Sequence, residues 1–243
     1  MPSQLARARK QLNSTLNLDP LMSAAISEVA LRDGASSALN ISLTDAEAAR
    51  LVDYGALLMK WGKVYNLTAV RDPSGVLTHH LLDSLAVVLP LRREMEVRGW
   101  ERIRLLDVGS GAGLPGAVIA VLCPNVDVTC LDAVAKKMAF VQQVAAELKL
   151  PNLRGLHARV EAVTDSYDVI SSRAFASLQD FIAGSANAIR AEGLWLAMKG
   201  RKPDDEIECL KADAEVFHVE QLNVPGLNAE RCIVWLGKRS AAA

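Results

Sequence analysis

The sequence predicts an α/β protein with a doubly wound sheet, a C-terminal antiparallel hairpin and a helical N-terminal extension. After residue 102, short apolar runs alternate with helical stretches, which is typical of a parallel sheet covered by helices on both faces. Two later strand-like runs, separated by the turn sequence PGLN, predict the hairpin. Residues 24–100 carry helical spacing instead. The chain has 243 residues, of which 51% are apolar, and this suits one domain with an appendage.

The predicted boundaries place a polar tail at residues 1–22, the helical extension at 23–100 and the sheet domain at 101–240. No continuous apolar run follows the basic residues of the tail, which argues against a signal peptide, and Met22 is a second candidate start. No continuous run reaches the roughly 18 apolar residues of a membrane span. We therefore expect a cytoplasmic protein without membrane attachment.

Within the extension, a helix start is predicted at Thr44, whose hydroxyl can cap the chain and which is followed by acidic residues. Residues 65–75 are rich in turn formers and predict a loop. The next sequence, THHLLDSLAVVLPL, predicts a helix that ends near Pro90. Between the cap and the loop, five apolar residues recur at helical spacing and predict core packing: Leu51, Tyr54, Leu57, Leu58 and Trp61.

Four short apolar runs in the sheet domain predict strands: IRLLDV, VDVTCLD, YDVISS and LWLAMK. The sequences AKKMAFVQQVAAELKL and SLQDFIAGSANAI between them predict helices. The hairpin is expected from EVFHVEQLNV and RCIVWLG. The four cysteines form neither CxxC pairs nor zinc spacing with histidine, so we expect reduced, buried thiols and no metal.

The string GAGLPG, from Gly111 to Gly116, follows the first predicted strand and matches the pattern GxGxxG, which alone is a weak signal. Asp132 stands at the end of the next strand, where a carboxylate can accept both ribose hydroxyls of an adenosine group. A nicotinamide dinucleotide and S-adenosylmethionine are both compatible with this arrangement. A purely structural glycine turn is a third interpretation.

Two residues favour S-adenosylmethionine. Pro115 removes a backbone N–H where a pyrophosphate would seek one. Asp107 places negative charge before the loop, which a diphosphate would not welcome, whereas the sulfonium and ammonium groups of the methyl donor are positive. Glycines at three positions let the backbone pass close to the donor without Cβ clashes: Gly109, Gly111 and Gly113.

Two motifs that the sequence lacks reduce the number of possible methyl acceptors. The segment SSRAFAS, after the predicted strand YDVISS, holds no Asp/Asn/Ser-Pro-Pro-aromatic loop of the kind that serves exocyclic amines. No cysteine lies in the Pro-Cys loop needed for attack at pyrimidine C5. An acceptor that is already nucleophilic remains, such as N7 of guanine. The net charge of −1 argues against nonspecific coating of nucleic acid but allows a local basic patch.

Basic residues follow two predicted strands, at the sheet edge where doubly wound folds bind ligands. Arg173 follows YDVISS, while Lys199, Arg201 and Lys202 follow LWLAM. These cations would hold phosphates. A surface salt bridge for Arg173 and a solvated turn for the KGRK segment stay open as alternatives.

Five segments occur together in the chain: YNLTAVRDP, HHLLDSL, GSGAGLPG, ISSRAFASL and AMKG. Over about residues 43–238 the sequence resembles the glucose-inhibited division protein B family of bacterial 16S rRNA guanine-N7 methyltransferases. The resemblance implies a class I methyltransferase fold, S-adenosylmethionine as donor and a guanine of the decoding-region loop of 16S rRNA, guanine 527 in the family, as acceptor. It also implies the small ribosomal subunit as partner, and no DNA or metal.

The resemblance carries over site residues as well. Donor contacts map to Gly109 and Leu114 in the glycine loop, to Val160 and Glu161, which would frame the adenine, and to Arg173.

Lys199 matches the family's KG position and is expected to hold RNA or the acceptor base, so Lys199 and Arg173 are the candidate catalytic residues. The YNLT and HHLLDS segments match positions expected to pack over the site, although His80 can equally be a core histidine and Asn66 can merely shape a turn. The candidate substrate-binding residues are Lys199, Arg201, Lys202, Asn66 and His80.

Three other functions remain compatible with the sequence. A methyltransferase for a small molecule or a protein is kept open by the weak net charge. An NAD-dependent oxidoreductase is disfavoured because nothing resembles a His–Asp or Tyr–Lys pair for hydride transfer. A non-catalytic binding module on the ribosome or the cell-division machinery would show no turnover.

Overall fold

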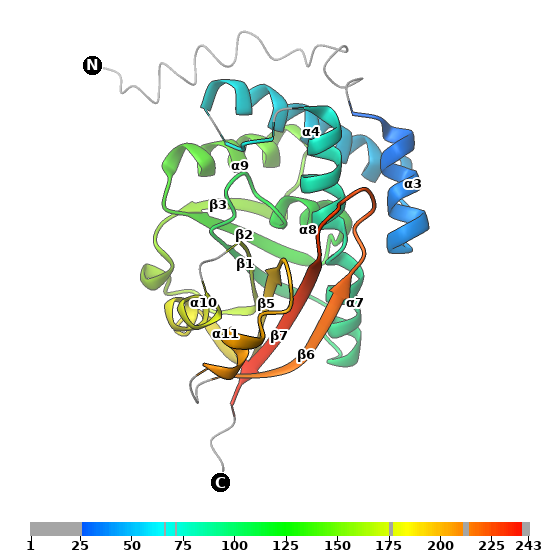
Figure 1. The fold of residues 1–243 in the computed structure, drawn as a ribbon. Helices are drawn as coiled ribbons and strands as arrows, with labels where there is room; N and C mark the ends of the chain where they lie inside the picture. The colour runs from blue at the N-terminus through cyan, green and yellow to red at the C-terminus, as the bar shows by residue number, and fades with distance from the viewer. Residues whose placement is uncertain (1–25, 66, 71, 175–176, 211–213, 240–243) are drawn as a thin grey trace, which may run out of the picture.

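The computed structural model describes residues 26–65, 67–70, 72–174, 177–210 and 214–239. The predicted tail at 1–22, the candidate start at Met22 and the candidate site residue Asn66 lie outside these residues. The described residues form a twisted sheet with helices on both faces, and the helices of the extension pack on one side of it (Figure 1).

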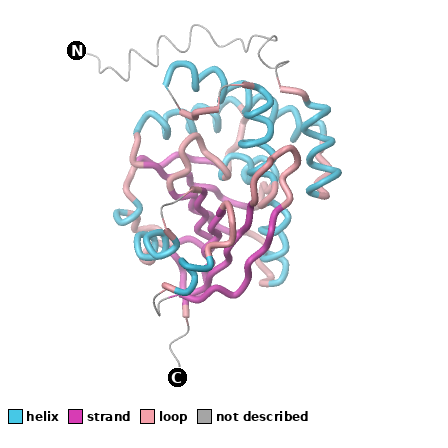
Figure 2. The backbone as a smooth tube through the Cα atoms, in the orientation of Figure 1, coloured by secondary structure: helices cyan, strands magenta, loops and turns pink. Residues whose placement is uncertain are grey.

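The sheet contains β1 (Ile103–Val108), β2 (Val126–Asp132), β3 (Leu153–His157), β4 (Tyr167–Arg173), β5 (Ile189–Lys199), β6 (Ala214–Leu222) and β7 (Arg231–Lys238). Their order across the sheet is β3-β2-β1-β4-β5-β7-β6. β1 to β5 pair in parallel, whereas β7 runs antiparallel to both β5 and β6. The doubly wound sheet and its C-terminal hairpin, seen as the magenta tube in Figure 2, confirm the predicted fold class.

The sequence prediction did not include β3. Its sequence, LRGLH, is short and has a glycine at its centre, which argues against a strand. The glycine is required by packing: a Cβ at Gly155 would lie only 2.8 Å from the carbonyl oxygen of Met138 in α9 (Ala135–Glu147). The close approach of α9 to the strand therefore explains why glycine, which has a low strand propensity, occupies position 155.

Helices cover the two faces of the sheet in separate layers (Figure 1). Along β1, Leu105 packs into one hydrophobic core and Leu106 into the other, as the alternation of strand side chains requires. The first core includes α8 (Gly116–Leu122) and α9, and the second includes α10 (Leu178–Ser185). Burial on both faces explains why the parallel strands read as continuous apolar runs.

The helices of the extension are α3 (Glu28–Leu39), α4 (Asp45–Tyr65), α5 (Pro73–Gly75), the π-helix η1 (Val76–Leu82), α6 (Asp83–Leu85) and α7 (Val88–Val97). The predicted start at Thr44 is confirmed. Its hydroxyl accepts the N–H of Glu47 at 3.3 Å, and the carboxylate of Glu47 accepts the N–H of Thr44 at 2.8 Å, which forms a capping box. α4 then packs on α9, with the rings of Trp61 and Phe140 5.2 Å apart.

The predicted helix end near Pro90 is wrong. The turn instead lies at residues 86–87, and α7 begins at Val88, which places Pro90 in the first turn of a helix. A proline is tolerated there because the N–H it lacks has no partner within the helix. The whole helical run from Pro73 to Val97 is long and apolar enough to cross a membrane, but 67% of its most apolar window is buried inside the protein.

Candidate functional site

The glycine loop joins β1 to α8 at the carboxyl edge of the parallel strands. Gly109, Gly111 and Gly113 have φ angles of +66°, +60° and +90°, which favour glycine. A Cβ at Gly111 would meet no atom within 4 Å, so the loop is open there to an approaching molecule. Gly113 instead packs on Val141, and Leu114 is buried.

Asp107 lies beneath the loop. It is fully buried, and its two carboxylate oxygens accept the N–H of Gly116 at 3.0 Å and the hydroxyl of Ser171 at 2.9 Å. Burial raises the pKa of Asp107 to about 6, against the opposing effects of the two hydrogen bonds and of the Arg173 charge. In the structure Asp107 fixes the loop to β4, and its predicted contact with the positive end of the donor stays a prediction.

Asp132 ends β2 and contacts the loop on its open side. Oδ2 accepts the N–H of Gly111 at 3.2 Å and the ammonium of Lys137 at 3.0 Å, while Oδ1 accepts the N–H of Val134 at 2.9 Å. The two carboxylates named from the sequence therefore hold the same loop from different strands. The predicted contact of Asp132 with a ribose stays a prediction.

The segment predicted to frame an adenine lies at the same sheet edge. It forms a short 3-10 helix, η2 (Val160–Ala162), just after β3. The imidazole of His157, the last residue of β3, contacts the carbonyl oxygen of Ala133 at 3.1 Å, so the loops after β2 and β3 lie side by side. Val160 is buried and Glu161 is exposed.

Tyr54 is a part of the site that sequence reasoning treated only as core. Its hydroxyl donates to the carbonyl oxygen of Ala112 in the glycine loop at 2.8 Å, and its ring stacks on Phe140 with centroids 6.5 Å apart. Helical periodicity identified the burial of this residue. A hydrogen bond to a partner 58 residues away in the chain leaves no local signal.

Arg173 ends β4 and is bound to the extension. Its Nη1 donates to the carbonyl oxygen of His79 and to the carboxylate of Asp83, both at 3.0 Å. Asp83, with 2% of its side chain exposed, also accepts the Nε of Arg231 at 2.9 Å. The salt bridge considered for Arg173 therefore forms, but with a buried partner. Sequence reasoning missed Asp83, although it lies in the HHLLDSL segment, and Arg231, which opens the last strand.

Lys199 ends β5, with its ammonium 3.0 and 2.8 Å from the two carboxylate oxygens of Glu206. Lys202 forms an ion pair with Asp204 at 2.6 Å, and Arg201 is exposed. The structure thus places the KGRK segment at the predicted edge, but carboxylates neutralise two of its cations.

His80 is buried in the π-helix, with its Nε2 2.6 Å from the hydroxyl of Thr68. Burial, together with the nearby charge of Arg173, lowers the pKa of His80 to about 4, so the imidazole is neutral at pH 7. This geometry fits the core interpretation of His80, and its role in substrate binding stays a prediction.

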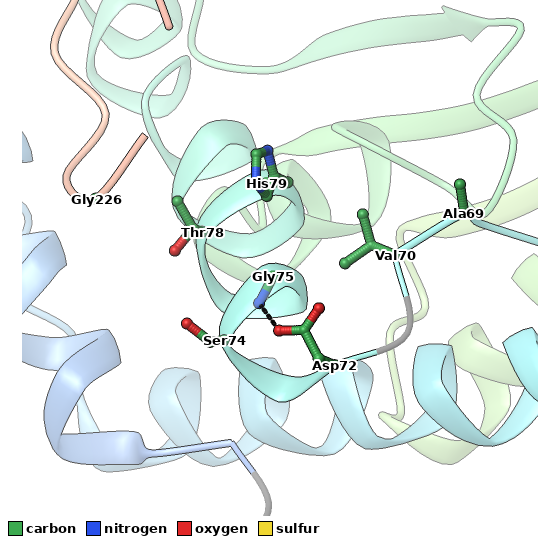
Figure 3. A pocket seen from close by; sticks show the side chains of 8 residues that line it. All are labelled: Ala69, Val70, Asp72, Ser74, Gly75, Thr78, His79 and Gly226. Atoms are coloured by element: carbon green, nitrogen blue, oxygen red, sulfur yellow. Dashed lines mark hydrogen bonds between the residues drawn. The ribbon is translucent and has the colours of Figure 1, made fainter. Parts of the chain in front are cut away.

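A groove with a volume of about 740 Å³ opens beside His79 (Figure 3). It is lined by Ala69, Val70, Asp72, Ser74, Gly75, Thr78, His79 and Gly226. Its floor is the start of the helical run, where Asp72 accepts the N–H of Gly75 at 2.7 Å. Among the described residues, no group of three or more His, Cys, Asp or Glu side chains is placed to hold a metal ion.

This strand order, with an antiparallel β7 and a glycine loop after β1, defines the class I methyltransferase fold. Similar solved structures include a ribosomal protein L11 methylase from Lactobacillus delbrueckii subsp. bulgaricus, with a TM-score of 0.52, 15% identity and coverage of 65% of this chain and 78% of that chain. TrmN from Thermus thermophilus aligns with a TM-score of 0.51, 17% identity and coverage of 67% and 53%. At these identities the likeness shows the fold alone.

The family is narrower than the fold. The pattern of the family described as GidB, rRNA small subunit methyltransferase G, matches residues 47–234, and the chain belongs to this family. Relatives named ribosomal RNA small subunit methyltransferase G include one from Polaromonas sp., 62% identical over 207 residues that cover 85% of this chain and 92% of the relative. One from Acidovorax sp. is 61% identical over 214 residues, with coverage of 86% and 94%. The resemblance drawn from the five segments is thereby confirmed.

Proposed function

We propose that this protein methylates ribosomal RNA in the cytoplasm, and that it transfers the methyl group of S-adenosylmethionine to N7 of guanine 527 in 16S rRNA within the small ribosomal subunit. The observation that carries the proposal is the family match over residues 47–234. That range includes the glycine loop, the carboxylates on either side of it and the cations at the ends of β4 and β5.

The residues of the loop fit S-adenosylmethionine better than a dinucleotide. The first two N–H groups of α8 are already bonded, that of Gly116 to Asp107 at 3.0 Å and that of Ala117 to the carbonyl oxygen of Gly113 at 2.7 Å. A pyrophosphate would need such donors to be free. The methyl donor needs none of them and supplies, when bound, a methyl group on a positively charged sulfur. In this proposal Asp132 holds its ribose hydroxyls.

Guanine N7 carries a lone pair and no proton, so the acceptor needs no general base. The task left to the protein is to position the two reactants. In this proposal Arg173 and Lys199, at the ends of neighbouring strands, hold the RNA and orient the acceptor base. Their positive charges would act on phosphates and base edges, because positive charge next to N7 would oppose the charge that develops there.

A methyl-transfer assay tests the proposal. The protein and radiolabelled S-adenosylmethionine would be offered naked 16S rRNA, small ribosomal subunits and cell extract depleted of RNA. We expect label as 7-methylguanine at one position of 16S rRNA, from the RNA or the subunit arm. Label found only in the depleted extract would move the substrate to a protein or a metabolite and would overturn the RNA assignment.

Titration calorimetry separates the remaining alternatives. An enzyme of this kind should bind S-adenosylmethionine and not NAD. Binding of the donor with no transfer to any of the three substrates would favour a non-catalytic module, and binding of NAD alone would favour an oxidoreductase.

A further inference from the structure

The cations at the carboxyl edge of the sheet are not neutralised equally. Among the described residues, Lys199 is the only cation paired with Glu206, and both oxygens of that carboxylate lie within 3.0 Å of its ammonium. The same carboxylate also accepts the N–H of Leu178 at 2.6 Å. Arg173 and Arg231 share the single carboxylate of Asp83, each through a different oxygen. Two guanidinium groups on one carboxylate leave one positive charge uncompensated at this point.

Arg173 and Arg231 come from strands on either side of β5. Arg173 is paired with Met198 in the β4–β5 register, and Cys232 of β7 is paired with Lys199, so Arg231 lies at the same edge just beyond the end of β5. Asp83 reaches both from the extension. Its side chain is 2% exposed, whereas those of Arg173 and Arg231 are 21% and 24% exposed.

Within the part of the chain that the structure describes, both guanidinium groups have N–H donors with no protein acceptor. Arg231 uses its Nε on Asp83 and its Nη1 on the carbonyl oxygen of Glu230 at 2.9 Å. Arg173 directs one nitrogen, Nη1, to both of its acceptors. A guanidinium has five N–H donors in a planar fork, which matches the oxygens of a phosphate.

We infer that Arg231 and Arg173 together form a binding site for a phosphodiester of the RNA, and that Asp83 is the positioning residue that sets the two side chains next to each other. The inference rests on the proposed function, since it names the contact by which that substrate is held. It adds Arg231, which no motif marked, to the residues that hold the RNA, and gives it a larger electrostatic contribution than Lys199, whose charge Glu206 neutralises.

The groove supports this assignment because one of its lining residues, His79, contacts Arg173. His79 lines the groove (Figure 3). Its carbonyl oxygen accepts the hydrogen bond from Nη1 of Arg173 at 3.0 Å. Gly226, which lines the groove beside Thr78, lies in the β6–β7 loop that precedes Arg231. In this inference the groove takes an unstacked nucleoside next to the phosphate, the form in which single-stranded RNA is usually recognised.

The salt dependence of RNA binding tests the inference, because each phosphate contact contributes about 0.7–0.9 to the slope of log affinity against log salt. The full-length protein would be titrated with naked 16S rRNA and with small subunits at several KCl concentrations. We expect Arg231→Gln to lower affinity roughly 10- to 100-fold, the range for charge-assisted hydrogen bonds, and to reduce the slope by about one contact. Arg231→Lys should restore the slope but only part of the affinity, because an ammonium cannot bind bidentately.

Two controls separate an RNA contact from a structural one. Arg102→Gln removes an arginine that pairs with Asp127 at the opposite ends of the strands, and it should change neither affinity nor slope. Donor affinity, measured by calorimetry, should be the same in all variants. Lys199→Gln should change the slope less than Arg231→Gln.

The outcomes also distinguish this inference from the proposed function. Suppose that the wild-type protein methylates 16S rRNA and that Arg231→Gln leaves the salt slope of RNA binding unchanged. Arg231 would then only connect the extension to β7, and this result would overturn the inference but not the proposed function. A wild-type protein that neither binds nor methylates either RNA substrate would overturn both.

Discussion

At the scale of single residues, three buried carboxylates lie at the candidate site, and they differ in the charge of their hydrogen-bond partners. Asp83 faces two arginines, and Asp132 faces a lysine and two backbone N–H groups. Asp107 has only neutral donors, Gly116 and Ser171, and is fully buried. Desolvation therefore dominates at Asp107 and raises its pKa to about 6.

The raised pKa of Asp107 predicts a specific pH dependence of stability. An unfolded aspartate titrates near 3.8, so between about pH 4 and 6 the folded protein keeps a proton that the unfolded chain has lost. The stabilisation is full below pH 4 and is lost as the pH rises through 6. We expect the unfolding free energy of the wild type, relative to Asp107→Asn, to fall by about 2–3 kcal/mol over this window, as measured by urea unfolding.

The control for this titration is Asp127→Asn. Hydrogen bonding to Arg102 lowers the pKa of Asp127, so its difference curve should run the other way, with stability lost as the pH falls. If the wild type and Asp107→Asn gave parallel curves from pH 4 to 7, the assigned cause would be wrong.

The role proposed for Asp132 predicts a loss of donor affinity. Asp132→Ala removes a charged acceptor from the open side of the glycine loop, and we expect S-adenosylmethionine to bind more weakly by about 1–3 kcal/mol in calorimetry. The matched variant Lys137→Ala removes only the ion pair on Asp132, and its affinity for S-adenosylmethionine should be much higher than that of Asp132→Ala. An unchanged dissociation constant in Asp132→Ala would rule out the ribose contact.

At the scale of elements, the sequence identified what is encoded locally. The strands at 103–108 and 126–132 appeared as apolar runs, and the start of α4 appeared through its cap. β3 was missed because it has a glycine at its centre, which argues against a strand; the glycine is there because α9 crosses too close for a Cβ. The continuation of the helical run past Pro90 was missed because one proline can either end a helix or stand in its first turn.

The support that α4 gives the glycine loop is testable through one hydroxyl. Tyr54→Phe leaves the carbonyl oxygen of Ala112 buried without its partner, which should lower the unfolding free energy by about 1–3 kcal/mol. Because that carbonyl belongs to the loop, donor affinity should fall as well.

A second tyrosine provides the comparison. Tyr167 is equally buried but begins β4, at the end of the strand away from the loop, where its hydroxyl lies 3.4 Å from Arg154. Tyr167→Phe should lower stability without changing donor affinity in calorimetry. Equal losses of donor affinity in the two variants would show that the effect is not specific to the loop.

At the scale of the whole molecule, the extension and the sheet domain meet at the site. Tyr54 holds the glycine loop from one side, and Asp83 binds the ends of β4 and β7 from another. The sequence placed Arg173 at the correct edge because strand ends can be read locally. It could not reveal Arg231, whose hydrogen bond to Asp83 spans 148 residues. The sequence could not reveal the neutralisation of Lys199 either, because the chain after β5 must first bring the carboxylate of Glu206 back to its ammonium. The KG motif itself carries no sign of this contact.

The junction at Asp83 predicts that the extension and the sheet domain unfold together. Asp83→Ala would leave two partly buried guanidinium groups without their shared carboxylate, and loss of one member of a buried ion pair typically costs about 3–5 kcal/mol. We expect urea unfolding to show this loss of unfolding free energy in Asp83→Ala. In the wild type, circular dichroism and tryptophan fluorescence should report the same single transition. Asp127→Ala, which breaks an exposed pair with Arg102, should cost less than about 1 kcal/mol. Equal effects of the two substitutions would mean that the junction is no stronger than a surface salt bridge, and two separate transitions would mean that the extension is not bound to the domain through this contact.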